Sequence, residues 1–416
     1  MLNSASHSDA CRVLSLACPY SKSASRSTLV KPYKQPAQLR PVLPADHRKQ
    51  STWKGAATVQ DASVSDVLHY VDAAQQTERP KIAVFSAHKY VHDFLSQPLF
   101  EEFPDSTFIE AQLDENTALL AAGHTTVCCF VNDDLSVGVI ERLAEVGVKF
   151  VAMRCAGVDR VDAPACQRLG IRVARVPTYS PASVAEHAIA MLLCLNRNLH
   201  MAHIRMWAGD YTLSGLVGFE LRCKTVGILG TGAIGAAAAR IFCGFGATVI
   251  AHDLYENAEL KKLGLTYVSK EELLQRANVI SLHCPLLPST YHIIDKASIE
   301  SMQPGAIIVN VSRGGLVDVD AAMDALETGQ LGGLALDVYE QEGTLFFKNW
   351  SSLSLGERYK AWDKKFQLLK SYPNVLISPH SAFLTAEALQ NIASTTVANI
   401  KEFHSGGRLT YEVLPK

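Results

Sequence analysis

One segment constrains the fold of this chain more than any other: the run TVGILGTGAIG, residues 225–235. Its apolar beginning predicts a strand, and the small residues that follow it predict a closely packed helix. A strand that turns into a helix through the spacing GxGxxG is typical of the first βαβ unit of a dinucleotide-binding domain. Gly230 permits the tight turn, Gly232 lets the backbone approach a pyrophosphate, and Gly235 allows the helix to pack on the strand.

Asp253 indicates which dinucleotide is bound. It ends the next apolar run, ATVIAHD, about 20 residues beyond the first glycine, where dinucleotide-binding domains place an acidic residue. A carboxylate there accepts hydrogen bonds from a ribose 2′-hydroxyl and repels a 2′-phosphate. The sequence therefore favours NAD over NADP as the cofactor.

Short apolar runs alternate with helix-like segments in two series along the chain. This alternation predicts parallel sheets with helices on both faces, so we expect an α/β protein with two doubly wound domains. The first series comprises residues 81–87, 107–112, 125–132, 149–154 and 172–177, and the second comprises residues 225–230, 247–253, 278–284, 306–311, 333–338 and 374–379.

A long apolar segment, residues 180–206, separates the two series. We expect one helix over this range, with Ser180 or Ser183 as its N-terminal cap. The segment is too apolar for an ordinary surface helix. We therefore expect it to be buried between domains, between subunits, or both.

The first 50 residues differ in composition from the rest of the chain. They are rich in serine, lysine and arginine, and Asp9 is the only acidic residue before Asp46. This composition is typical of an organelle transit peptide and favours a plastid over a mitochondrion. The alternative is a plain tail on a cytoplasmic protein. Residues 59–74 are weakly amphipathic, and we expect one helix there.

Charge, hydropathy and cysteine spacing exclude several functional classes. The net charge is −2, which gives no strong basic field for nucleic acid. No apolar run reaches the ~18 residues that a membrane-spanning helix needs. None of the ten cysteines forms a CxxC pair, so we expect no zinc site and mostly reduced, buried thiols. A redox switch stays open as an alternative.

Polar residues at the ends of the later strands are the candidates for chemistry, because ligands of open α/β sheets bind there. They are Ser312 and Arg313, then Glu340 and Glu342, then His380. An arginine can clamp a carboxylate bidentately, and a histidine held by a carboxylate can transfer a proton near neutral pH. This set suits reduction of a 2-keto acid.

Other histidines compete with His380 for the role of acid and base. His283 lies in SLHCP near the expected cofactor and could act as a base on position alone. His187 lies in the apolar helix and is interpreted as structural. Position in the sequence does not decide between His380 and His283.

At these residues the sequence resembles the D-isomer-specific 2-hydroxyacid dehydrogenases, and within them the D-lactate dehydrogenase branch. The resemblance extends over residues 80–410, which is essentially all of the chain beyond the N-terminal extension. The matching stretches are FVND (130–133), RCAGVDRVD (154–162), VPTYSPASVAEHA (176–188), GILGTGAIG (227–235), ISLHCPL (280–286), NVSRGGLVD (310–318), LDVYEQEG (336–343), LFF (345–347) and SPHSAF (378–383).

The resemblance implies roles for individual residues. Arg313 matches the substrate-binding arginine, Glu342 rather than Glu340 matches the carboxylate paired with the histidine, and His380 matches the acid and base. The implied NAD contacts, beyond the three glycines, are Ala233, Ile234, Asp253, Cys284, Pro285, Thr290, Val311, Ser312 and Asp337, with Asp337 near the nicotinamide. The implied substrate contacts are Ala156, Gly157, Tyr179, Arg313 and Phe383, of which Tyr179 and Phe383 shape a small pocket for a methyl group.

The resemblance also implies a divided substrate domain. An extension (1–79) would precede the first part of a flavodoxin-like substrate domain (80–179), a Rossmann NAD domain (180–378), and the second part of the substrate domain (379–416). Hydride transfer would occur in the cleft between the domains. Residues 180–206 would form the contact of a homodimer or a dimer of dimers.

Three functions follow from these expectations. The first is reversible, NADH-dependent reduction of pyruvate to D-lactate at the end of fermentation. The second is the same chemistry on another acid: glyoxylate, hydroxypyruvate, phosphoglycerate or a branched 2-keto acid. The third is an NAD(H)-sensing, corepressor-like binding protein. The sequence departs from the family pattern at two places: Gly343 stands where many relatives have proline, and the segment 347–372 matches weakly.

Overall fold

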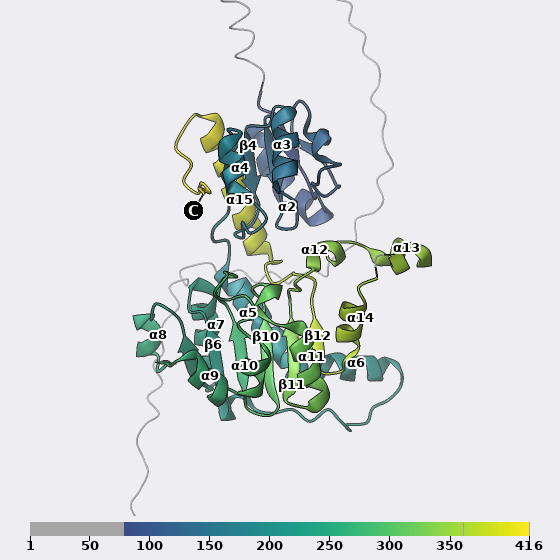
Figure 1. Cartoon of the computed structure of the whole chain (residues 1–416), viewed down its shortest axis with the longest axis vertical. Coiled ribbons are helices and arrows are strands. Elements are labelled where there is room, and N and C mark those ends of the chain that lie inside the picture. Colours follow the sequence, from purple (N-terminus) through teal and green to yellow (C-terminus); the bar gives the residue numbers. More distant parts are fainter. Residues whose placement is uncertain (1–78, 361, 416) are drawn as a thin grey trace, which may run out of the picture. The chain divides into compact units, whose positions relative to one another are not determined.

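The computed structural model describes residues 79–360 and 362–415, which belong to one compact unit spanning Val71–Lys416. The expected N-terminal extension and the helix over 59–74 lie outside the described residues. The unit contains two parallel sheets, of five and seven strands (Figure 1). The prediction of an α/β protein with two parallel sheets is confirmed.

The first sheet has the strand order β2-β1-β3-β4-β5. Every pairing is parallel, and the central strands are buried along their whole length because helices cover both faces. Its strands are β1 (Ile82–Val84), β2 (Thr107–Phe108), β3 (Thr126–Cys129), β4 (Phe150–Met153) and β5 (Arg172–Ala174), and its helices are α2 (Lys89–Glu102), the 3₁₀ turn η1 (Ala118–Ala121), α3 (Val137–Glu145) and α4 (Ala163–Arg168).

The C-terminal helix α15 (Ala386–His404) packs against this first sheet, although it follows the second sheet in the chain (Figure 1). Its buried residues Ala393, Val397 and Ile400 share one core cluster with Val91 of α2 and Phe150 of β4. Residues 386–404 therefore complete the core of the first sheet. The division into an extension (1–79), a substrate domain (80–179 and 379–416) and an NAD domain (180–378) stays a prediction.

The second sheet has the order β12-β11-β10-β9-β6-β7-β8, again all parallel. Its strands are β6 (Thr225–Leu229), β7 (Thr248–His252), β8 (Thr266–Tyr267), β9 (Val279–Leu282), β10 (Ala306–Asn310), β11 (Leu331–Leu336) and β12 (Val375–Ile377). The helices of this part are α5 (Pro181–Asn196), α6 (Leu199–Trp207), α7 (Ala233–Gly244), α8 (Ala258–Lys262), α9 (Lys270–Arg276), α10 (Lys296–Glu300), α11 (Val319–Thr328), α12 (Glu342–Leu345), α13 (Leu355–Lys360) and α14 (Lys364–Ser371), with 3₁₀ turns η2 (Leu221–Cys223), η3 (Gly314–Leu316) and η4 (Trp350–Ser352).

The single helix expected over residues 180–206 is wrong. The segment forms two helices, because Asn198 adopts a left-handed conformation with φ 48° that an α-helix does not continue through. Ser180 caps α5 by accepting a hydrogen bond from the Ser183 backbone N–H. Helix α5 is buried against α7 and the second sheet, whereas α6 has no buried residue.

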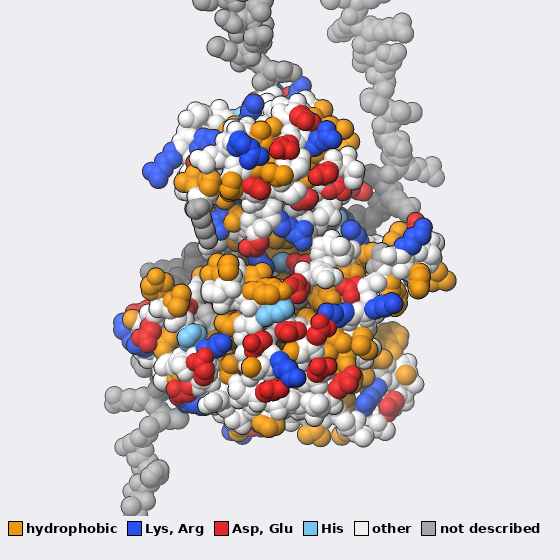
Figure 2. All heavy atoms as spheres, in the orientation of Figure 1, with side chains coloured by type: hydrophobic (Ala, Val, Ile, Leu, Met, Phe, Trp, Pro, Cys, Tyr) orange, Lys and Arg blue, Asp and Glu red, His pale blue; other side chains and the backbone are white. Residues whose placement is uncertain are grey.

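Charges are mixed on the face of the protein shown in Figure 2, where acidic and basic side chains are interspersed.

No helix in residues 79–360 and 362–415 combines the length and hydropathy needed to cross a membrane. Within the same residues, no cluster of His, Cys, Asp and Glu could hold a metal ion.

Candidate active site

The glycine loop connects β6 to α7 and is tightly packed at two of its three glycines. Gly230 has φ 92°, and a Cβ there would overlap the backbone of Cys284. A Cβ on Gly235 would overlap the carbonyl of Gly230, so the helix lies directly on the loop. Nothing lies within 4 Å of the Cβ position of Gly232, which leaves its backbone open to a ligand.

Asp253 follows β7 and contacts the glycine loop. Its carboxylate accepts hydrogen bonds from the backbone N–H and the hydroxyl of Thr231, and from the backbone N–H of Tyr255. Burial by itself would raise the pKa of Asp253, but these hydrogen bonds outweigh it and hold the pKa below its ordinary value. The carboxylate is therefore ionised at neutral pH beside the loop.

A cavity of about 390 Å³, called the main cavity below, lies beyond the carboxyl ends of the strands. Residues from loops that follow strands of both sheets line it. The predicted site residues that it brings together are Ala156, Gly157, Tyr179, Ile234, Pro285, Val311, Ser312, Arg313, Asp337, His380 and Phe383. Gly232 and Ala233 line an adjoining cavity of about 160 Å³ together with Ile234.

Five predicted cofactor residues are not in the linings of these two cavities: Gly230, Gly235, Asp253, Cys284 and Thr290. The first two shape the loop by packing. The hydroxyl of Thr290 is used within its own turn, where it donates to the carbonyl of Pro285. The carbonyl of Cys284 accepts a hydrogen bond from the Ser312 hydroxyl, which ties the loop after β9 to the loop after β10.

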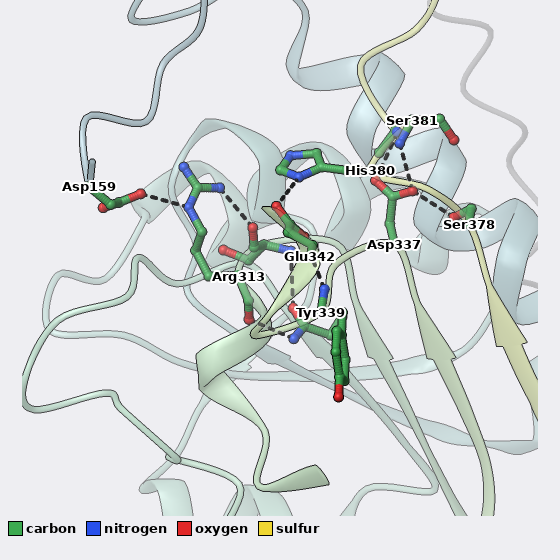
Figure 3. A network of polar contacts seen from close by, with 11 residues as sticks. Asp159, Arg313, Asp337, Tyr339, Glu342, Ser378, His380 and Ser381 are labelled. Carbon is green, nitrogen blue, oxygen red and sulfur yellow. Dashed lines mark hydrogen bonds and ion pairs between the residues drawn. The ribbon is translucent and has the colours of Figure 1, made fainter. Parts of the chain in front are cut away.

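His380 is paired with a carboxylate. Its Nδ1 lies 2.7 Å from Oε1 of Glu342 (Figure 3). Glu340 instead accepts a hydrogen bond from the Tyr291 hydroxyl. Glu342 begins the short helix α12, and its second oxygen accepts a hydrogen bond from the backbone N–H of Tyr339. Nε2 of the imidazole has no hydrogen-bond partner within the described part of the chain, so it is available to a ligand in the main cavity, which His380 lines.

The segment that carries His380 is held by Asp337, which is fully buried at the end of β11. The Asp337 carboxylate accepts hydrogen bonds from the Ser378 hydroxyl and from the backbone N–H groups of Ser381 and Ala382 (Figure 3). Burial would raise its pKa, but the hydrogen bonds from His187, Ser378 and the backbone together lower it. His187 contacts both Ser378 and Asp337, so it supports this segment.

Arg313 follows β10, is fixed by two hydrogen bonds and fits into the space beside Gly157. Its Nε donates to Oδ2 of Asp159 at 2.8 Å, and its Nη1 donates to the carbonyl of Ser312 (Figure 3). Its Nη2 lies where a Cβ on residue 157 would be, so Gly157 is the residue that leaves room for it. Burial opposes the charge, but the Asp159 carboxylate offsets this and raises the pKa of Arg313 above its ordinary value.

His283 does not suit the role of an acid and base near neutral pH. Its side chain is half-buried, and burial lowers its pKa to about 4. Its Nε2 contacts the Ser281 hydroxyl, and its Nδ1 has no hydrogen-bond partner among the residues that the structure describes. The ring lines both the main cavity and the adjoining cavity at the glycine loop.

Among the residues that were not predicted from the sequence, two pairs have evident roles at the site. Asp159 pairs with Arg313, and Arg175 lines the main cavity and donates to the carbonyl of Ala156. Phe130 and Phe347 bring two further rings to Phe383 and His380. Arg175 and Phe130 directly follow β5 and β3, so the rule that located Arg313 would also have located them.

Comparisons with known proteins identify the family. A family model described as "D-isomer specific 2-hydroxyacid dehydrogenase, NAD binding domain" matches residues 189–382. The D-lactate dehydrogenase of Escherichia coli is 44% identical over 327 residues, which cover 78% of this chain and 97% of that protein. The chain belongs to the D-isomer-specific 2-hydroxyacid dehydrogenase family. It is accordingly an NAD-dependent oxidoreductase.

Two solved structures of this dehydrogenase family extend the comparison. The pyruvate reductase of Chlamydomonas reinhardtii is 51% identical with a TM-score of 0.77, and the match covers 80% of this chain and 98% of that one. The D-lactate dehydrogenase of Aquifex aeolicus, solved with NAD and lactic acid, is 30% identical with a TM-score of 0.68, covering 78% and 96%. The fold and the cofactor predicted from the sequence are confirmed.

The residues present here fit NAD. The open backbone at Gly232, the N-terminus of α7 and the ionised Asp253 correspond to the pyrophosphate and ribose ends of a dinucleotide. The unpartnered Nδ1 of His283 supplies a polar contact between the glycine loop and the main cavity. The dehydrogenase fold therefore places the cofactor cradle next to Arg313 and His380.

Proposed function

We propose that this dehydrogenase reduces pyruvate to D-lactate with NADH, and that Arg313, Glu342 and His380 carry the reaction. The observation that supports this most strongly is the convergence of the Glu342–His380 pair and Arg313 on one cavity. The similarity to D-lactate dehydrogenases and to a pyruvate reductase supports the choice of substrate.

Arg313 would bind the carboxylate of the keto acid. Asp159 holds Nε, and the remaining N–H groups face the part of the cavity bordered by Ala156 and Gly157. Backbone N–H groups of that segment would share the negative charge of the substrate carboxylate. A planar guanidinium makes two parallel hydrogen bonds to a carboxylate, so it orients the substrate as well as binding it.

His380 would move the proton. In the reduction, its Nε2 donates a proton to the keto oxygen as that oxygen gains charge, and in the oxidation it takes the proton back. Glu342 orients the ring through its contact with Nδ1. NADH, when bound, supplies the hydride to the carbonyl carbon. Closure of the cavity around these groups would exclude water.

The aromatic residues of the cavity would favour a small side chain. Tyr179 lies edge-on to Phe383 with ring centres 6.4 Å apart, and both rings line the main cavity. Burial raises the pKa of Tyr179 to about 12, so its hydroxyl is neutral at physiological pH. A methyl group beside these rings gains contact without the cost of removing charge from water.

The test is NADH oxidation at neutral pH with pyruvate, glyoxylate, hydroxypyruvate and 2-ketoisocaproate in parallel, with the product resolved on a chiral column. We expect the highest kcat/KM with pyruvate and a D-lactate product. Preference for another acid would move the protein to a sister branch of the family. Absence of turnover in a folded, NADH-binding protein would favour the corepressor-like alternative.

His380→Ala tests the assignment of the acid and base. We expect kcat with pyruvate to fall by about 10²–10⁴-fold, because proton transfer contributes on that scale. NADH affinity, measured by the fluorescence of the bound cofactor, should change little. His187→Ala is the comparison variant, since that ring only supports the segment carrying His380. Equal losses in the two variants would contradict the assignment.

We also propose assembly and location. Leu199, Ile204, Met206 and Trp207 of α6 are exposed in the single chain, and a second copy of the chain would cover them in a homodimer or a dimer of dimers. The N-terminal composition supports import into a chloroplast. A fluorescent fusion of residues 1–79 tests this, and reporter signal in mitochondria or the cytoplasm would contradict it.

A further inference from the structure

Phe347 has an unusual backbone for a bulky residue. Its φ is 62°, in the left-handed region that residues other than glycine adopt rarely. It follows α12, whose residues Leu345 and Phe346 are buried in the core of the second sheet. These two buried side chains anchor the turn, and the half-buried Phe347 packs both against the edge of that core and against the cluster that contains Phe130 and Phe383.

The ring of Phe347 meets Phe130 there. The two ring centres lie 5.2 Å apart at 85°, an edge-to-face contact, and Phe130 in turn lies 5.6 Å from Phe383. Phe347 also lies 6.2 Å from the ring of His380. The three phenylalanines come from the loops after β3, after α12 and after β12, and they converge next to the imidazole.

A second cavity lies beside this contact. It measures about 380 Å³, is lined by Tyr90, Phe347, Lys348, Leu384 and others, and is called the side cavity here. It shares His380 and Phe383 with the main cavity, and of these two cavities Phe130 lines the main one and Phe347 the side one. The Phe130–Phe347 contact therefore lies between the two cavities.

The wall between the cavities consists of side chains. No described hydrogen bond links Phe347 to Phe130 or Phe383, and the contact is between rings. Removing the Phe347 ring would therefore join two spaces of nearly equal volume next to His380. The side chain of a bound 2-keto acid lies near the imidazole, because it is carried by the carbon whose keto oxygen must reach His380.

We propose that Phe347 is a specificity-determining residue, whose ring closes the substrate pocket toward the side cavity and excludes 2-keto acids with long or branched apolar side chains. This inference rests on the proposed function and adds to it the structural cause of the small substrate. The lining of the side cavity by Phe383, Leu384 and Tyr90 matches an apolar side chain.

The test compares kcat/KM for pyruvate, 2-ketoisocaproate and phenylpyruvate in the wild type, Phe347→Gly and Phe347→Leu. Glycine removes the ring and also adopts φ 62° without strain. We expect the ratio of kcat/KM for 2-ketoisocaproate to that for pyruvate to rise at least tenfold in F347G and less in F347L. A few methylene groups in an apolar pocket change selectivity on this scale.

Lys348→Ala is the matched control. Lys348 is the exposed neighbour that lines the side cavity and contributes no ring to the wall, so its replacement should leave the ratio unchanged. The D-stereochemistry of the product and the NADH affinity should stay the same in all variants, since neither depends on this wall.

Three outcomes would overturn the inference. One is a ratio that changes less than threefold in both variants while pyruvate is still reduced. Another is a response of the same size in K348A. The third is loss of turnover with every acid in a folded variant, which would place the ring in the chemistry. If F347G does not fold, F347L decides. The proposed function is judged separately, from the preference of the wild type.

Discussion

At the scale of single residues, the position of the Arg313 guanidinium is set by the groups around it. Asp159 takes Nε, the carbonyl of Ser312 takes Nη1, and Gly157 leaves space for Nη2. A lysine places one ammonium group on a flexible chain and cannot occupy these three positions together. The shape of the guanidinium is therefore as important to the site as its charge.

We predict that Arg313→Lys raises KM for pyruvate about 10- to 100-fold, the loss expected when a charge-assisted hydrogen bond to the substrate is removed. NADH affinity should stay within a factor of two or three of the wild type. Arg160→Lys, a change at the exposed arginine that follows Asp159, provides the control in the same steady-state assay. An unchanged KM in R313K would show that the carboxylate is bound elsewhere.

His283 makes stability depend on pH. Its pKa is about 4 in the folded protein against an ordinary value of 6.5. Between pH 6.5 and 4 the unfolded chain therefore binds more protons at this residue, so the free energy of unfolding falls as the pH falls. The full effect, reached below pH 4, is about 3 kcal/mol.

We predict that His283→Asn reduces the loss of stability on acidification. Between pH 7.5 and 5.0, denaturant unfolding of the cofactor-free protein should show a decrease about 2 kcal/mol smaller than in the wild type. His92→Asn removes an exposed histidine and serves as the reference. The same pH dependence in H283N and the wild type would mean that this ring does not resist protonation.

At the scale of elements, the unit formed by β6, the glycine loop and α7 assigns different tasks to its glycines. Gly235 is needed for packing, since any Cβ would overlap the carbonyl of Gly230. Gly232 has an ordinary φ of −59° and free space around it, so the fold does not require a glycine there. The presence of a glycine at position 232 is explained by a ligand that approaches the backbone there.

We predict that Gly232→Ala and Gly235→Ala separate folding from cofactor binding. G232A should unfold at the same denaturant concentration as the wild type but bind NADH at least tenfold more weakly. G235A should lose about 1–3 kcal/mol of stability, the usual cost of overpacking. Calorimetric titration with NADH and denaturant unfolding measure both quantities, and equal effects of the two substitutions on unfolding would refute the distinction.

The elements also show where sequence reasoning succeeds. Runs rich in Val, Ile and Leu, such as those of β6 and β10, form strands because buried parallel strands need such residues on both faces. The two-residue strand β8 carries too short a pattern to be recognised. The break at Asn198 depends on one backbone angle inside a continuous apolar pattern, so periodicity does not reveal it.

The candidate site was predictable in part for a similar reason. Arg313, Glu342 and His380 follow strands of one sheet, and parallel strands bring their ends together. The choice of Glu342 over Glu340 came from the family resemblance, since both follow β11. The contact of Phe130 with Phe347 joins positions far apart in the chain, and it depends on a positive φ that no local pattern indicates.

At the scale of the whole molecule, the exposed apolar residues of α6 and the segment after it lead to a prediction about assembly. Trp207 is 83% exposed and Val217 is 91% exposed, which is unusual for residues that gain by burial. We predict that light scattering of the wild type gives at least twice the chain mass of 45.2 kDa, and that Trp207→Asp shifts it toward the monomer. Tyr359→Asp, an equally exposed aromatic position on α13, should have no effect. A monomeric wild type would contradict the proposed dimer.

The return of α15 to the first sheet sets an order of events during synthesis. The second sheet has all its strands once Ile377 has left the ribosome, so that half of the protein can fold while the chain is still growing. The first sheet begins earlier in the sequence, yet its core stays uncovered at Val91 and Phe150 until Val397 and Ile400 emerge. The half that is translated first is thus the half that is finished last. A nascent chain stalled before residue 386 would present that apolar surface to chaperones.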